Sequence, residues 1–383
     1  MSVLVITRGW AGWPHFAGST WVPMQYVLGF QRLGVPAYWI DHLPAIAPQA
    51  VHGVEHLIHR FASTAAEFGY ADRWCVVYDG GRRWFGLTEE RARAVVEQAG
   101  LLLSLSGKGL PPPLPLRAVP RRGYVDVDPA FTQIWATQVD MGLSDYDLFF
   151  TVGHNIGRPG CRAPDLGLDW QPLFPPVVLD LWPARIDPRC ERFSTIADWW
   201  GDQMADHEGE YYGGKRAEFL RLLHVPQASG KRVEIALSIY PRDHADIGRL
   251  DAHGWTLLDP AVVAGDPAAY REFIGRSRAE FSAAKGGYVK SRSGWLSDRT
   301  VCYLASGKPA LVQSTGIEEH LPTGEGLLTF TTPEEALAGL AAIDARYLEH
   351  AAAARALAER HFDARVVLAG LLERAGVPRA ASI

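Results

Sequence analysis

The chain has 383 residues, of which 48% are hydrophobic and 21% are charged. Single domains usually have about 50–200 residues, so we expect two domains, and this composition leaves little room for long disordered segments. The 38 basic and 43 acidic residues give a formal net charge of −5. Such a chain lacks the basic surface that nucleic-acid binding requires, so we do not expect nucleic acid as a partner.

Four cysteines, Cys75, Cys161, Cys190 and Cys302, lie far apart and form no Cys-x-x-Cys pair. This spacing favours separate thiols in a reducing compartment over disulfides or zinc ligands. The apolar opening segment is interrupted by Arg8 and has no basic leader, which is not typical of a signal peptide. No apolar run approaches the roughly 20 residues that cross a bilayer. The sequence therefore predicts a cytoplasmic protein without a membrane span.

The first half of the chain alternates between short apolar runs and helical periods. A β-branched run at 2–7 ends at a glycine-rich loop, and a helical period at 21–34 leads to a second strand at 35–41. This βαβ unit has its loop at the carboxyl end of a strand, where open α/β sheets bind ligands. Further units follow, with a helix at 88–100 and strands at 101–107, 122–129 and 146–153. We expect one parallel sheet covered by helices.

The second half repeats this pattern. We expect strands at 232–240, 254–260, 307–314 and 324–330, and helices at 266–284, 297–306 and 332–362. The junction is expected near 224–231, which gives domains 1–226 and 227–383, with the last helix able to pack back on the first domain. The predicted fold class is α/β, with two Rossmann-like domains facing a cleft. Such a cleft suits an enzyme that holds one substrate on each domain.

The segment RSGWLSDRTVCYLASGKPA, from Arg292 to Ala310, combines a tight turn with a helix start. Gly294 allows the turn, and Ser297 stands where a helix N-cap is expected. A helix N-terminus presents free N–H groups that suit a phosphate, and the Arg292 guanidinium can bind phosphate oxygens in a bidentate manner. The alternative is a capped structural helix with a surface arginine.

This segment resembles the phosphate-binding turn of the glycosyltransferases with the GT-B fold, whose plant natural-product members carry His-Cys-Gly-Trp-Asn-Ser. Gly294, Trp295 and Ser297 match that motif, and Arg292 stands at the diphosphate-binding histidine. The family's Gly-x-Pro and sugar-binding acid follow at Gly307–Pro309 and Glu318. The resemblance implies sites for a donor diphosphate at Lys290, Arg292, Ser293, Gly294, Ser297 and Arg299, and for the donor sugar at Gly316, Glu318 and Glu319.

The chain differs from that family at the positions that bind the ribose of the donor nucleotide. The ribose-binding glutamate of the plant enzymes falls on Cys302 or Thr300, and the paired glutamates of the retaining GT-B enzymes fall on Gly294 and Cys302. Glu280, in the preceding predicted helix, is a candidate for this role. Lys290 is read from the sequence as either a second phosphate contact or a structural charge.

Transfer of a sugar to a hydroxyl needs a group that accepts the acceptor's proton. His15 lies in the first glycine-rich loop among Gly9, Gly12 and Gly18, which would form the acceptor loop. Inverting GT-B enzymes keep their base histidine in this loop, and an aspartate orients it. Asp126 and Asp128 are the candidates for that aspartate.

His154, which follows another predicted strand, is the rival base to His15. The Asp126-Val-Asp128 motif also has an alternative interpretation, because two acids one residue apart bind Mn²⁺ and a diphosphate in the other main glycosyltransferase fold. Asp128 is followed by Pro129 and reads as an N-cap with proline at the first helical position, which favours a metal-free site.

The sequence thus predicts a metal-independent glycosyltransferase that needs no cofactor beyond a UDP- or TDP-linked sugar. A small molecule, such as a natural-product intermediate, is the expected acceptor. Two alternatives stay open, a sugar-nucleotide epimerase or hydrolase of the same fold and a non-catalytic nucleotide-sugar binding protein.

Overall fold

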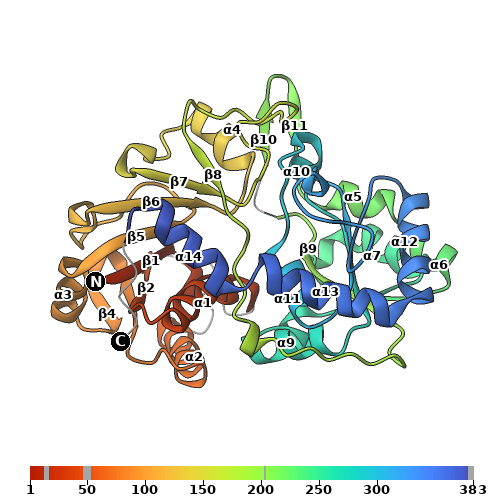
Figure 1. Cartoon of the computed structure of the whole chain (residues 1–383), viewed down its shortest axis with the longest axis horizontal. Helices are drawn as coiled ribbons and strands as arrows, with labels where there is room; N and C mark the ends of the chain where they lie inside the picture. The colour runs from red at the N-terminus through yellow and green to blue at the C-terminus, as the bar shows by residue number, and fades with distance from the viewer. Residues whose placement is uncertain (13–16, 46–52, 202–203, 378–383) are drawn as a thin grey trace.

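A computed structural model describes residues 1–12, 17–45, 53–201 and 204–377. The described residues form two large sheets, one in each half of the molecule (Figure 1). The N-terminal sheet has the order β4-β3-β2-β1-β5-β6-β7-β8 and is parallel except for the edge pair β3–β4. Its strands are β1 Ser2–Arg8, β2 Ala37–Leu43, β3 Trp74–Tyr78, β4 Arg83–Gly86, β5 Ala99–Leu105, β6 Arg121–Asp126, β7 Leu148–Thr151 and β8 Trp170–Pro172.

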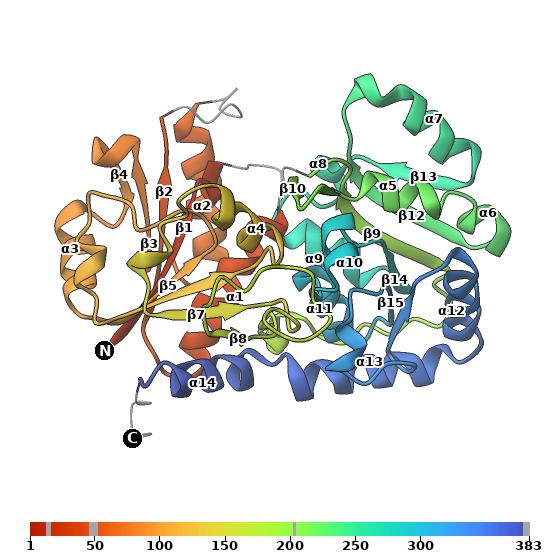
Figure 2. The same ribbon diagram turned by 90° about the horizontal axis from the view of Figure 1, so that it is seen from above.

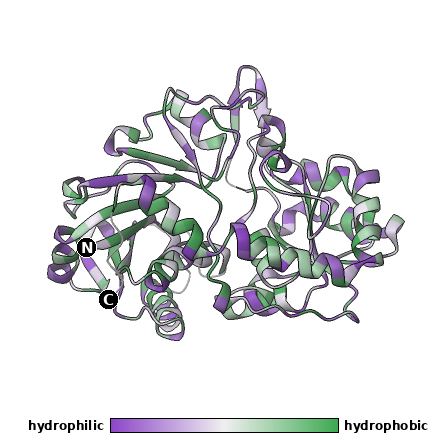
Figure 3. Cartoon of the chain, in the orientation of Figure 1, coloured by the Kyte–Doolittle hydropathy of each residue, from purple (hydrophilic) through white to green (hydrophobic). Residues whose placement is uncertain are grey.

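Helices cover both faces of this sheet, as a parallel sheet requires. The central strands are therefore largely apolar: Val3 to Ile6 of β1 have no exposed surface. Figure 3 shows hydrophobic colour in this region and helices of mixed hydropathy around it. The helices of this half are α1 Ala17–Arg32, α2 Val54–Glu67, α3 Glu89–Glu97 and α4 Phe131–Gln138.

The second sheet is wholly parallel and has the order β13-β12-β9-β14-β15-β16. In both sheets the chain starts at a central strand, adds strands on one side (β2 to β4 in the first sheet, β12 and β13 in the second) and then crosses to the other side. The crossing points lie between β1 and β5 and between β9 and β14, where such sheets bind ligands. The strands of the second sheet are β9 Arg192–Asp198, β12 Arg232–Ser238, β13 Trp255–Leu258, β14 Ala279–Ser282, β15 Ala310–Gln313 and β16 Leu327–Phe330.

The chain enters the second sheet at β9, which lies before the predicted junction at 226/227. That junction falls inside α6 (Val225–Ser229), after the hairpin β10–β11 (Ala205–His207, Glu210–Tyr212) and α5 (Arg216–Arg221). No strand was predicted from the sequence at β9. Its sequence RFSTIAD buries Ser194 and Thr195 in mid-strand, so it lacks the apolar run typical of a central parallel strand.

The predicted C-terminal helix at 332–362 is two helices, α12 (Pro333–Ala345) and α13 (Tyr347–His361), which meet at Arg346. Helix α14 (Ala364–Arg374) continues along the line of α13 and packs on α1 of the N-terminal half (Figure 2). The other helices of the second half are α7 His244–Ala252, α8 Pro260–Val263, α9 Pro267–Gly275, α10 Gly286–Ser291 and α11 Asp298–Ala305. No helix in the described ranges is long and apolar enough to cross a membrane.

The contact between α1 and α14 depends on Gly29. A Cβ atom at this position would lie 2.6 Å from Leu368 Cδ1 and 2.8 Å from Ala364 Cβ. We expect Gly29→Ala to lower the free energy of unfolding by about 1–3 kcal/mol, because the two helices must move apart. Urea denaturation measures this. Gly248, an exposed glycine in α7 with nothing within 4 Å of its Cβ position, is the matched control. Gly248→Ala should be neutral or stabilising, and equal losses at both positions would contradict close packing at Gly29.

Candidate active site in the interdomain cleft

A cleft of about 450 Å³ lies between the two sheets, at the carboxyl ends of their central strands. The N-terminal half contributes the start of α1 and the loops after β5 and β6. The C-terminal half contributes the loops after β9, β12 and β13 and the starts of α10 and α11. The described lining includes Gly18, Ser19, Val22, Ser106, Val127 and Asp128 from the first half, and Asp198, Lys215, Ser238, Pro260, Ala264, Tyr270, Lys285, Tyr288, Trp295, Ser297, Asp298 and Arg299 from the second.

The loop after β1 is held in place by Asp41 of β2. This carboxylate is fully buried and accepts hydrogen bonds from Thr7 Oγ1 at 2.6 Å and from the Ala11 N–H at 2.8 Å. Burial raises the pKa of Asp41, and these hydrogen bonds partly offset that effect. Asp41 therefore fixes the turn at Trp10 and Ala11 after β1. At the start of α1, Gly18 comes close to Tyr270 of the other half.

The N-terminus of α11 is anchored by a buried ion pair. Arg299 Nε lies 2.6 Å from Glu280 Oε1, and both side chains are almost wholly buried. The same guanidinium donates to Ser282 Oγ at 2.7 Å and to the Ile196 carbonyl at 2.8 Å. The start of α11 is thereby held against the carboxyl ends of β9 and β14, with Ser297 as its N-cap. Its first N–H groups form an anion-binding terminus at the cleft.

Lys215, at the start of α5, is a buried cation of the cleft that was not predicted from the sequence. It lines the cleft, only 7% of its surface is exposed, and its ammonium has no hydrogen-bond or ion-pair partner in the described part of the chain. Burial lowers the pKa of Lys215 well below its usual range, and repulsion by Arg299 and Lys285 lowers it further. An unpaired buried ammonium is costly unless an anion joins it. The sequence signal was Gly213-Gly214 followed by a lysine at a helix start.

The cleft contains a second, paired lysine. Lys285 of the C-terminal half lies 2.8 Å from Asp128 Oδ1 of the N-terminal half, and the Tyr288 hydroxyl donates to the same oxygen at 2.6 Å. The ammonium lowers the pKa of Asp128 against the effect of burial. Asp128 is thus bound across the cleft by two groups of the opposite half, which holds the halves together at this point.

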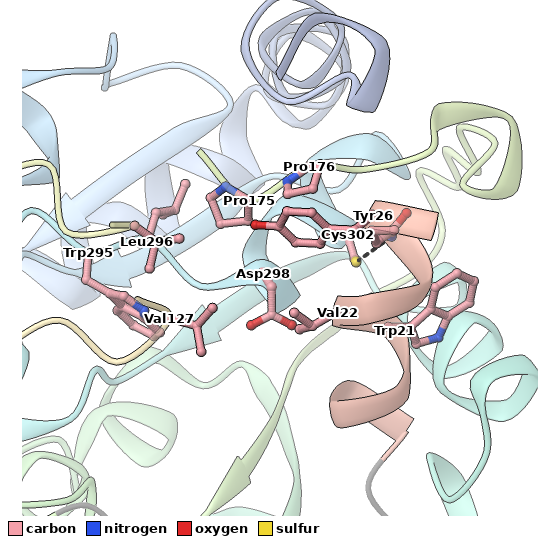
Figure 4. Close-up of a pocket in the computed structure, with 12 residues that line it drawn as sticks. Trp21, Val22, Tyr26, Val127, Pro175, Pro176, Trp295, Leu296, Asp298 and Cys302 are labelled. Atoms are coloured by element: carbon pink, nitrogen blue, oxygen red, sulfur yellow. Dashed lines mark hydrogen bonds between the residues drawn. The ribbon is translucent and has the colours of Figure 1, made fainter. Parts of the chain in front are cut away.

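Asp298 is a carboxylate of the cleft that, unlike Asp128, has no side-chain partner among the described residues. It is the first residue of α11, and its side chain lies between Val22 of α1 and Val127 (Figure 4). Burial raises the pKa of Asp298, and Arg299 partly offsets this. A carboxylate with a raised pKa in an apolar setting is suited to accept a proton.

A smaller pocket of about 30 Å³ adjoins the cleft beside Asp298. Val22, Val127, Trp295 and Asp298 line both spaces. The remaining wall is mainly apolar and comes from α1, the loops after β7 and β8, the turn before α11 and α11 itself: Trp21, Gln25, Tyr26, Val152, Pro175, Pro176, Leu296 and Cys302. Figure 4 shows most of these side chains around Asp298. Its volume fits a small apolar group or one or two waters.

Of the residues predicted to bind the donor diphosphate, Ser297 and Arg299 line the cleft, whereas Arg292 does not. Arg292 has a left-handed backbone with φ 51°, and its half-exposed guanidinium lies 2.6 Å from Glu319 Oε1. The left-handed backbone turns this side chain toward the Glu319 loop. Lys290 likewise lies away from the cleft, where it donates to the Tyr211 carbonyl and pairs with Glu210 at 3.3 Å.

The predicted turn at Ser293 and Gly294 forms a contact between the two halves. Gly294 lies against Asn155 of the loop after β7, and its N–H donates to the Thr315 carbonyl at 2.7 Å. The Asn155 N–H in turn donates to the Ser293 carbonyl at 3.0 Å. A side chain at Gly294 would collide with Asn155, so close interdomain packing accounts for this glycine.

The three residues predicted to bind the donor sugar lie in the neighbouring loop and are absent from the described cleft lining. Gly316 has φ 89° and packs on the Asn155 side chain. Glu318 accepts a hydrogen bond from Ser314 Oγ at 2.6 Å, and Glu319 binds Arg292. These contacts brace the loop after β15 against the turn at Arg292.

His15, the predicted base, lies outside the described residues. At Gly12 only the backbone is described. Gly9 has φ 76° and marks the turn after β1. Gly18 is the acceptor-loop glycine found in the cleft lining. The base role of His15 therefore stays a prediction.

The two other predicted catalytic residues are buried behind the cleft. Asp126 Oδ2 accepts from Gln133 Nε2 at 2.9 Å and from Thr151 Oγ1 at 2.7 Å, and burial raises the pKa of Asp126 to about 6. His154 stacks on Phe174 with the ring centroids 3.9 Å apart. Burial, with His320 nearby, lowers the pKa of His154 to about 3. Asp126 and Asp128 face different partners, so the described geometry does not bring them together as paired metal ligands.

Glu280 does not reach the cleft surface. Its side chain is fully buried and binds Arg299, so its interpretation as a ribose ligand is wrong. Glu280 belongs to strand β14, whose four residues are all buried, and not to the predicted helix.

The C-terminal half is similar in sequence to a known family, since the model of the family described as glycosyl transferase-like matches residues 227–371. A comparison with curated protein sequences finds no match. The whole fold is similar to an alpha-glucosyltransferase in complex with UDP, with a TM-score of 0.60 and 10% identity over 98% of this chain and 100% of that one. It is also similar to HepE from Anabaena in complex with UDP and glucose, with a TM-score of 0.55 and 12% identity over 98% and 99% of the two chains.

The chain has the GT-B fold of glycosyltransferases. The two Rossmann-like sheets and these similar structures confirm the predicted fold class, and the family match of the C-terminal domain confirms the predicted enzyme class. In this glycosyltransferase the cleft lies at the crossing points of both sheets.

The buried ion pair under α11 provides a test of this arrangement. We expect Glu280→Gln to lower the free energy of unfolding by about 3–5 kcal/mol, because it leaves the Arg299 guanidinium buried without a counter-charge. Glu272, which pairs with Arg185 at the surface with both side chains more than 40% exposed, is the control. Glu272→Gln should cost less than about 1 kcal/mol. Similar losses in urea denaturation for both variants would show that the buried pair does not anchor the helix.

Proposed function

We propose that this glycosyltransferase transfers a sugar from a nucleotide diphosphate sugar to a hydroxyl group of an acceptor in the interdomain cleft. The observation that carries the proposal is the unpaired, buried Lys215 in the same cleft as the N-terminus of α11. A diphosphate supplies the negative charge that both groups lack. The buried pair of Arg299 and Glu280 keeps the helix in place.

Lys215 and the N–H groups of α11 act at the leaving diphosphate, where negative charge develops during the reaction. As the bond between the anomeric carbon and the diphosphate oxygen breaks, the electron pair moves to the diphosphate. Lys215 and the N–H groups of α11 stabilise that charge, and the new bond forms from the acceptor oxygen to the anomeric carbon. The proton of the acceptor hydroxyl moves to a base, for which His15 and Asp298 are the two candidates. Because Lys215 and α11 provide the positive charge, the proposed reaction needs no metal.

The nucleoside end is proposed to lie beyond the diphosphate, toward Ser238, Pro260 and Ala264 after β12 and β13, which line the same cleft. The similar structures hold UDP, which supports a uridine nucleotide as the donor of this chain. The small pocket beside Asp298 is proposed to take an apolar part of the acceptor.

A small-molecule acceptor stays the proposal for this chain. One similar structure is an alpha-glucosyltransferase with UDP and a 13-mer DNA, at 12% identity and a TM-score of 0.58. The net charge of −5 of this chain favours a small acceptor over DNA. Turnover assays with both acceptor classes distinguish the two.

The assignment of the diphosphate site is tested with two matched variants. Lys215→Met should weaken UDP binding about tenfold or more, since a charge-assisted contact is lost. Lys290→Met should change the affinity less than about twofold, because this lysine lies outside the cleft lining. Isothermal titration with UDP gives both values.

Arg292→Met belongs in the same titration, because the sequence analysis predicts that Arg292 binds the diphosphate. A loss at Arg292 with none at Lys215 would contradict the Lys215 site and favour the sequence-based assignment. The pH dependence gives a second readout. The Lys215 pKa is lowered in the free protein and is raised by a bound anion, so binding takes up a proton. UDP affinity should be full below the pKa of the free protein and fall as the pH rises toward the pKa in the complex.

The base is tested by Asp298→Asn and His15→Ala. If Asp298 accepts the acceptor's proton, Asp298→Asn should lower kcat about a hundredfold and leave UDP affinity unchanged. Wild-type turnover should rise with pH through the raised pKa of Asp298, and this dependence should be lost in the variant. If Asp298→Asn turns over at nearly the wild-type rate, Asp298 is not the base. If His15→Ala turns over at nearly the wild-type rate, His15 is not the base.

A further inference from the structure

A second groove of about 500 Å³ lies behind the cleft, between α5, α10 and the β10–β11 hairpin. Its described lining shares no residue with the cleft. The backbones at Trp200 and Gly214 touch between the two spaces, since a Cβ at Gly214 would lie 1.8 Å from the Trp200 carbonyl oxygen. The groove is therefore a separate site, one chain thickness away from Lys215.

Two aromatic side chains stand in this groove with their rings accessible. Trp200 is 37% exposed and Tyr211 is 54% exposed. The Trp200 indole is fixed by a hydrogen bond of 2.8 Å from Nε1 to Asp243 and by the Arg216 guanidinium, 5.2 Å from the ring centroid. The Tyr211 ring packs on Gly213, which leaves no room for a side chain there. Fixed aromatic surfaces bind a flat apolar face at a low cost in conformational entropy.

The charges of the groove are paired with each other. Arg216 Nε lies 2.6 Å from Asp246 Oδ2, and Arg221 lies 3.1 Å from Glu218. Lys290 lies 3.3 Å from Glu210. Unlike Lys215 in the cleft, each cation has a carboxylate partner, so an anionic ligand gains little here. Glu218, Arg221 and Lys290 still offer hydrogen-bonding groups to a neutral polar ligand.

We propose that this groove binds a neutral saccharide, with one pyranose ring stacked on Trp200 or Tyr211. A pyranose has an apolar C–H face for an aromatic ring and hydroxyl groups that exchange hydrogen bonds with carboxylates and guanidinium groups. Fixed aromatic faces, paired charges and a volume within the usual range of ligand pockets together favour this ligand class. The proposal does not depend on sugar transfer in the cleft.

The test uses maltohexaose, cellohexaose and laminarihexaose as neutral probes in isothermal titration, with and without saturating UDP. We expect at least one probe to bind the wild-type protein equally well in both conditions. Tyr211→Ala should weaken that binding about fivefold or more, and so should Trp200→Ala. Tyr240, which is also 54% exposed and carries a cation–π contact with Arg242 but lies outside the groove lining, is the matched control. Tyr240→Ala should bind the probe like the wild type.

Trp200→Phe separates stacking from folding, because it keeps an aromatic ring and should retain most of the affinity. Melting temperatures of all variants check that they are folded. Absence of binding to all three probes at millimolar concentration would overturn the proposal. Binding that UDP abolishes would place the saccharide in the cleft, and tighter binding of inorganic phosphate than of any probe would contradict a neutral ligand. UDP titrations of the same variants keep this outcome separate from that of the proposed function.

Discussion

The buried pair of Arg299 and Glu280 is the constraint on which the cleft depends. A guanidinium and a carboxylate this deeply buried need partners, and each of the three guanidinium nitrogens donates one hydrogen bond, to Glu280, to the Ile196 carbonyl and to Ser282. These contacts join α11 to both central strands of the second sheet, β9 and β14. The N-terminus of α11 is thereby held at the crossing point of the sheet, where a ligand meets its N–H groups.

The second requirement is that the two halves meet at fixed points beside the cleft. Asp128 binds Lys285 and Tyr288, and Asn155 binds the neighbouring turn at Ser293. Helix α14 adds a third contact, because it packs on α1 of the first half. The cleft next to these contacts has room for a substrate, and Lys215 and Asp298 are left without side-chain partners in the described chain.

The parts of this arrangement that local sequence determines were predictable. The periodic runs predicted both sheets, and the Ser297 cap with Gly294 before it predicted the start of α11. Positions that depend on distant contacts were not predictable. Arg292 has the residue type for a phosphate, but its left-handed backbone points it toward Glu319. Strand β9 lacks an apolar run because Ser194 and Thr195 hydrogen-bond to buried side chains beside it, which the local sequence does not reveal. Lys215 becomes notable only because the fold buries it in the cleft.

The pairing of charges distinguishes the two spaces of the C-terminal half more clearly than their residue content does. Both contain lysine or arginine near aromatic rings. In the cleft the buried cation forms no ion pair within the described residues, and nearby acids offset the cost of its desolvation only in part, so an anion is favoured there. In the groove behind it each of three cations has a carboxylate within 3.3 Å, so a second anion would compete with an existing partner. A neutral ligand with hydroxyl groups meets no such competition, and the accessible faces of Trp200 and Tyr211 then supply the apolar contact.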